Sequence, residues 1–119
     1  MTHLKSNNEI ITDAPVDNQG KGEAFSPTDL VAGSLSACMM TIMGQVAQRE
    51  SINMVGLTTD ITKVMSASPR KIAEIIINFK WPEISLTAKQ KTMLINAAKT
   101  CPVAQSLNPD IKQTVGFNL

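Results

Sequence analysis

Two cysteines are the residues of this chain whose type and setting could carry chemistry. Cys38 lies in a long stretch without charged side chains, and Cys101 opens a segment that begins with Pro102. If the fold brings the two sulfurs together, one can act as a nucleophile and the other as its resolving partner, which is the chemistry of a thiol peroxidase. The alternative is that both are small buried hydrophobes, the usual role of a free cysteine. Sequence spacing leaves both interpretations open.

The local settings of the two cysteines differ. Because Cys101 precedes Pro102, it can be the N-cap of a short helix, where free N–H groups favour a thiolate. Cys38 lies about three turns into its predicted helix, too far from the end for the helix dipole to act strongly. Its thiolate would need a nearby cation or hydrogen-bond donors.

Two other polar residues are candidates for a site. Asp29 could be an acidic site residue, but a capping box that starts at Ser26 explains its position without any function. His3 is the only histidine and lies close to the N-terminus. Two cysteines and one isolated histidine do not match the ligand spacing of a zinc site, so we expect no metal.

The elements that must position the cysteines can be read from hydrophobic periodicity. A short strand is predicted over 9–12, followed by a helix from Pro27 to about Glu50 that Ser26 caps. Apolar residues at spacings of three and four predict one buried face of this helix. They are Val31, Leu35, Cys38, Met39, Ile42 and Val46.

The second half of the chain predicts a hairpin, two helices and a strand. Alternation over 56–65 and 70–81 is typical of a hairpin with one buried face. Thr87 is expected to cap a helix over 88–99, Cys101 opens a short helix, and a last strand follows over 112–119. The order predicts one α+β domain, residues 1–119, with an antiparallel sheet and a long central helix.

Composition argues against several classes of function. The net charge is +1 and aromatic residues make up 3% of the chain, so neither nucleic acid nor an anionic membrane is an expected partner. No apolar signal segment is visible at the N-terminus, which predicts a cytoplasmic, reducing location. In that compartment two cysteines are expected to be free, catalytic or redox-active.

The stretch between Asp29 and Arg49 contains no charge and is long enough to span a bilayer. Its glycine, serine and glutamine residues make it too polar for lipid, so we interpret it as a buried helix. One small sheet covers such a helix on one side only. We therefore expect the same helix of a second chain to provide further cover, in a homodimer.

Several motifs together resemble the OsmC/Ohr family, the osmotically inducible and organic hydroperoxide resistance proteins, and within it the OsmC-like subgroup. The resemblance covers about residues 9–119. It is carried by Ser26-Pro27-Thr28-Asp29-Leu30, Ala37-Cys38, Pro69-Arg70-Lys71-Ile72 and Thr100-Cys101-Pro102-Val103-Ala104-Gln105-Ser106-Leu107.

The resemblance implies an intertwined homodimer with sites at the subunit interface and an antioxidant role in oxidative stress. Cys38 would attack an organic hydroperoxide and become a sulfenic acid, Cys101 would condense with it to a disulfide, and a dithiol would reduce that disulfide. No metal, haem or flavin is implied as a cofactor.

The chain departs from the family pattern in its activating residues. Active members place an arginine ahead of the long helix and a glutamate ten residues before the first cysteine. Here no arginine precedes Arg49, and Thr28 occupies the glutamate position with Asp29 beside it. The alternative function is therefore a non-catalytic protein that binds a small apolar ligand at the dimer interface.

Overall fold

The computed structural model describes all residues, 1–119. They form two compact units, Met1–Val31 and Ala32–Leu119, which are described in turn. That the whole chain is one domain stays a prediction.

The first unit contains little regular structure. Strands β1 (Thr2–His3) and β2 (Asn8–Glu9) form a short antiparallel hairpin, and a 3-10 helix, η1, covers Val16–Asn18. The predicted strand over 9–12 is therefore wrong beyond Glu9. Ile11 is 80% exposed, so this apolar run has no packing surface that would make an extended ladder favourable.

Helix α1 (Pro27–Arg49) begins where the sequence predicts. The backbone N–H of Ser26 donates to Asp29 Oδ2 at 2.9 Å, and the N–H of Asp29 donates to Ser26 Oγ at 3.1 Å. This reciprocal pair is the predicted capping box, and it satisfies two N–H groups that a helix start leaves without partners.

The second unit is built on a three-stranded sheet in the order β3-β4-β5. Strands β3 (Thr58–Ala67) and β4 (Arg70–Lys80) are antiparallel, as predicted, whereas β5 (Lys112–Gly116) lies parallel to β4. The sheet is thus mixed rather than wholly antiparallel. A parallel return is possible because the long connection between β4 and β5 contains two helices.

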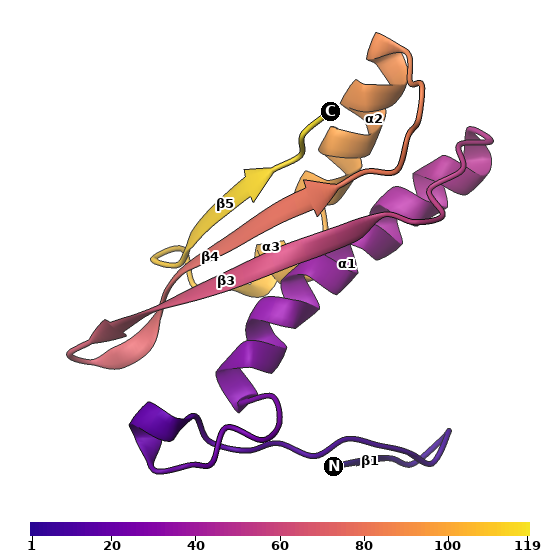
Figure 1. Cartoon of the computed structure of the whole chain (residues 1–119). Coiled ribbons are helices and arrows are strands. Elements are labelled where there is room, and N and C mark those ends of the chain that lie inside the picture. The colour runs from indigo at the N-terminus through magenta and orange to yellow at the C-terminus, as the bar shows by residue number, and fades with distance from the viewer. The chain divides into compact units, whose positions relative to one another are not determined.

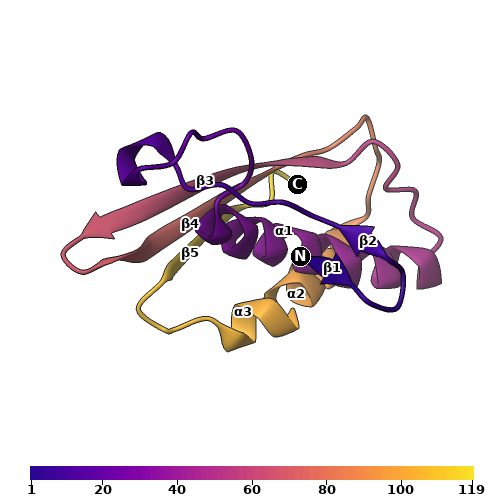
Figure 2. The ribbon, with the colours of Figure 1, turned by 90° about the horizontal axis from the view of Figure 1, so that it is seen from below.

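These helices share one face of the sheet with α1, so this unit has two layers (Figure 2). Helix α2 (Ala88–Lys99) begins at the predicted Thr87, and helix α3 (Pro102–Ser106) is a single short segment between α2 and β5 (Figure 1). The α+β class is confirmed. Buried core residues of α1, β4 and α2 meet between the layers; among them are Leu35, Met43, Ile75, Ile77, Phe79, Leu94 and Ala98.

The buried face of α1 is rotated slightly from the predicted one. Leu35 and Met39 are buried as expected, but Val31 is 36% exposed, and Cys38 is only partly buried. Small residues turn toward the sheet instead, and Ser36 Oγ lies 2.7 Å from Thr59 Oγ1 of β3. By length and composition α1 could also cross a membrane, although a third of its most apolar window (33%) is buried within the chain.

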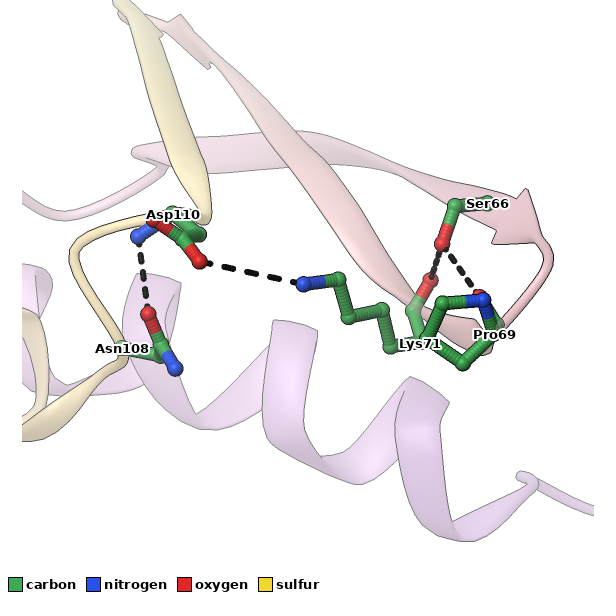
Figure 3. A network of polar contacts seen from close by, with 5 residues as sticks. All are labelled: Ser66, Pro69, Lys71, Asn108 and Asp110. Atoms are coloured by element: carbon green, nitrogen blue, oxygen red, sulfur yellow. Dashed lines mark hydrogen bonds and ion pairs between the residues drawn. The ribbon is translucent and has the colours of Figure 1, made fainter.

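The loop that leads from α3 into β5 is held by polar contacts near the start of β4. Lys71 Nζ lies 3.8 Å from Asp110 Oδ2, and the backbone N–H of Asp110 donates to Asn108 Oδ1 at 2.9 Å (Figure 3). The ion pair is solvent-exposed and contributes at most about 1 kcal/mol. These contacts link the loop after α3 to the start of β4.

Candidate functional site

Cys101 occupies the N-cap of α3, as its position before Pro102 predicts. The backbone N–H of Ala104 donates to Cys101 Sγ at 3.2 Å. The residue is completely buried, with an exposed fraction of 0%. Its sulfur therefore takes the place that an oxygen of serine or aspartate occupies at most helix starts.

The structure brings Cys38 and Cys101 together. The Cys101 thiol is a hydrogen-bonding neighbour of Cys38, and both cysteines are free. Cys38 comes from α1 and is partly exposed, whereas Cys101 comes from α3 and lies in the core. The pair thus joins a partly exposed residue to a fully buried one. Their catalytic roles stay a prediction.

The environment of Cys101 favours its protonated form. Burial raises the pKa of the Cys101 thiol above the ordinary value of 9.0, and the hydrogen bond with Cys38 and the charge on Cys38 raise it further. The N–H groups of Ala104 and Val103 lower this pKa but do not outweigh burial. At neutral pH, Cys101 is therefore a thiol.

Asp29 lies at the start of α1, where its capping contacts account for its position. Within the first unit it also borders a pocket of about 520 Å³ with Ile11, Phe25 and three neighbouring residues. A catalytic role for Asp29 stays a prediction. No group of three or more His, Cys, Asp or Glu side chains is placed to hold a metal ion.

A small pocket that was not predicted is lined in part by sequence neighbours of the two cysteines. It has a volume of about 240 Å³ and is lined by Met39, Lys99, Ala104, Gln113, Val115 and Phe117. Met39 follows Cys38 on α1, and Ala104 is the residue whose N–H contacts Cys101. The pocket draws on four elements, and no local sequence pattern could have revealed it.

Comparisons with known proteins agree on one family. The sequence model of the OsmC-like protein family matches residues 20–115. A protein from Psychrobacter arcticus 273-4, proposed to be an osmotic stress induced and detoxification response protein, is 55% identical over 97% of this chain and 83% of its own, with a TM-score of 0.91. Among proteins with curated descriptions, none matches the chain.

More distant structures share the fold. The organic hydroperoxide resistance protein OsmC of Legionella pneumophila has a TM-score of 0.68 at 18% identity, over 87% of this chain and 77% of its own. A Vibrio cholerae protein proposed to be an organic hydroperoxide resistance protein has a TM-score of 0.70 at 19% identity, over 98% of this chain and 81% of its own. At these identities the likeness concerns the arrangement of helices and strands alone.

Proposed function

The chain belongs to the OsmC-like protein family, and from that premise we propose that it is a cysteine-based peroxidase that reduces organic hydroperoxides. The observation that carries the proposal is the contact between the Cys38 and Cys101 thiols, which come from different helices. Two fold neighbours whose descriptions name organic hydroperoxide resistance add support. We place the activity in the cytoplasm, in protection against oxidative stress.

In the first step the Cys38 thiolate attacks the outer oxygen of the hydroperoxide. The O–O bond breaks, an S–O bond forms, and the alkoxide leaves and takes a proton from water to become the alcohol, so that Cys38 becomes a sulfenic acid. Cys38 is the sulfur suited to this step because it is partly exposed and Cys101 is buried.

In the second step Cys101 attacks the sulfenic sulfur of Cys38. An S–S bond forms and the sulfenic oxygen leaves as water, which takes up the thiol proton. The N–H groups of Ala104 and Val103 stabilise the developing thiolate, since both lower the pKa of Cys101. An external dithiol then reduces the disulfide by thiol–disulfide exchange and closes the cycle.

The test separates the two cysteines. One equivalent of cumene hydroperoxide should convert the wild-type protein to an intramolecular Cys38–Cys101 disulfide, seen by mass spectrometry as a loss of two hydrogens. In Cys101→Ser, the same treatment should stop at a sulfenic acid on Cys38 that a 1,3-dione reagent traps, and excess peroxide should over-oxidise it.

Turnover provides the second measurement. Cys38→Ser should abolish dithiol-dependent consumption of the hydroperoxide, because no nucleophile remains. A known thiol peroxidase treated alongside is the positive control. If that control oxidises while both cysteines of this protein stay reduced, the proposed mechanism is wrong, and the family assignment is unaffected.

A second candidate function is supported by one feature of the sequence. No arginine precedes Arg49, so the chain lacks the arginine that active relatives are expected to use ahead of the long helix. A lysine such as Lys5 or Lys21 does not reproduce a bidentate arginine–carboxylate pair. A non-catalytic protein that binds a small apolar ligand would account for this, and an absence of turnover with every dithiol tested would favour it.

A further inference from the structure

We propose that the pocket of about 240 Å³ lined by Met39, Lys99, Ala104, Gln113, Val115 and Phe117, here called the Lys99 pocket, binds a short aliphatic carboxylate. The proposal concerns binding alone and does not depend on peroxidase chemistry. It is argued from the walls of the pocket, from its one charged residue and from the contacts around it.

The walls of the Lys99 pocket suit a hydrocarbon chain. Met39 is almost fully buried, and Val115, Phe117 and Ala104 are partly buried against the same core. Each methylene moved from water into such surroundings contributes about 0.8 kcal/mol. The volume falls just below the roughly 300–1,000 Å³ of pockets for drug-sized ligands, so the pocket fits a short chain.

Lys99 provides the charge that selects the head group. It lies in the last turn of α2, and no carboxylate of the chain is paired with it. In contrast, Lys71, Lys80 and Lys112 each lie within ion-pair distance of an acidic side chain. An unpaired ammonium group beside an apolar pocket favours an anionic head group attached to an apolar chain.

Gln113 adds a directional donor. Its side-chain nitrogen donates to the carbonyl oxygen of Ala104 at 3.1 Å, which fixes the amide against α3. The same NH₂ group carries a second N–H, which a carboxylate oxygen can accept. The head group would therefore be held by an ammonium from α2 and an amide from β5, while the chain packs between them.

The protein contains its own reporter for this pocket. Trp81 is the only tryptophan, and its Nε1 donates to the carbonyl oxygen of Phe117 at 2.6 Å. The rings of Phe79 and Phe117 are stacked with centroids 5.4 Å apart, and Phe79 also stacks on Trp81. A ligand that moves Phe117 should therefore change the fluorescence of Trp81.

The experiment titrates the reduced wild-type protein with octanoate, octanol and acetate below micelle-forming concentrations. Octanoate should give a saturable change in Trp81 fluorescence. Octanol should bind roughly threefold to tenfold more weakly because it lacks the charge, and acetate should not bind because it lacks the chain. Methyl NMR shifts of Met39 and Val115 should follow the same titration and so locate the ligand.

Two matched variants decide the role of the charge. Lys99→Met should lose the preference for octanoate over octanol and keep the affinity for octanol, whereas Lys89→Met, in the first turn of α2 and outside the pocket, should behave as wild type. Unchanged octanoate affinity in Lys99→Met would overturn the proposal. So would the absence of saturable binding, or shifts confined to residues outside the pocket.

Discussion

At Cys101, burial and helix-start hydrogen bonds act in opposite directions. A thiol at an N-cap is usually one whose pKa is lowered by the free N–H groups. Here burial is the larger effect, and together with Cys38 it raises the pKa of Cys101. In the proposed mechanism, the N–H groups of this helix start would therefore stabilise a thiolate that forms when Cys101 attacks, and not a resting thiolate.

The raised pKa of Cys101 predicts how stability depends on pH. The unfolded chain ionises this thiol near its ordinary value of 9.0, while the folded protein retains the proton to higher pH. The contribution of Cys101 is thus fully present below pH 9 and is lost as the pH rises through the folded pKa, with a slope of at most about 1.4 kcal/mol per pH unit.

Urea unfolding of reduced wild type and Cys101→Ser between pH 8 and about 10.5 measures this contribution. The free energy of unfolding should fall more steeply with pH in the wild type, because serine does not titrate there. Lysines are common to both proteins and cancel in the comparison. Equal slopes would show that burial of Cys101 does not raise its pKa.

The sequence predicted part of this site for local reasons. Pro102 after Cys101 indicated a helix start, because the fit of proline to the first helical turn is a property of neighbouring residues. The contact of Cys101 with Cys38 was implied by the family resemblance alone, since residue spacing does not show how the chain brings α3 back to α1 on one face of the sheet. The Lys99 pocket was missed for the same reason.

At the scale of elements, α2 depends on its N-cap residue, Thr87. The backbone N–H of Thr87 donates to Gln90 Oε1 at 3.0 Å, and the N–H of Gln90 donates to Thr87 Oγ1 at 3.1 Å. We expect Thr87→Ala to lower the free energy of unfolding by about 1 kcal/mol, because it leaves an N–H without its partner. Chemical denaturation at neutral pH measures the change.

Thr92→Ala is the matched control for this prediction. Thr92 is exposed in the middle of α2 and donates to the carbonyl oxygen of Ala88. Alanine has the higher helix propensity, so this variant should be as stable as wild type or slightly more stable. If Thr92→Ala lowered the free energy of unfolding as much as Thr87→Ala, the cap would not be what stabilises the start of α2.

Elements with a strong internal pattern were predicted well. Alternating Ile75, Ile77 and Phe79 marked β4 and its buried face, and these three side chains are at most 1% exposed. The prediction of a strand over 9–12 was wrong beyond Glu9, because two adjacent isoleucines do not show whether a partner strand exists. The parallel pairing of β5 was missed since strand direction depends on the connection, which periodicity does not describe.

At the scale of the whole molecule, α1 is incompletely covered by its own chain. An added Cβ at Gly33 or Gly44 would meet no atom within 4 Å, although each glycine weakens a helix interior by about 1 kcal/mol relative to alanine. Two such sites on one helix favour close approach by a second copy. We therefore expect light scattering at micromolar concentration to give twice the chain mass of 12.8 kDa.

Gly44→Leu tests which surface forms that dimer. An added Cβ at Gly44 meets no neighbouring element within 4 Å, so we expect the leucine variant to keep its fold by circular dichroism and to shift toward monomer. Wild-type protein that is monomeric at micromolar concentration would contradict the dimer. A dimer unaffected by Gly44→Leu would place the interface on another surface.

The meeting of Cys38 and Cys101 has a consequence for chain topology. A bond between the sulfurs would close a covalent ring containing β3, β4 and α2, and so would restrict the unfolded chain far more than the folded one. A disulfide that closes a ring of roughly 15 to 100 residues stabilises the folded state by about 3–4.7 kcal/mol through this restriction. The peroxide-oxidised protein should therefore unfold at higher denaturant concentration than the reduced protein. The midpoint of unfolding would then show whether the disulfide has formed.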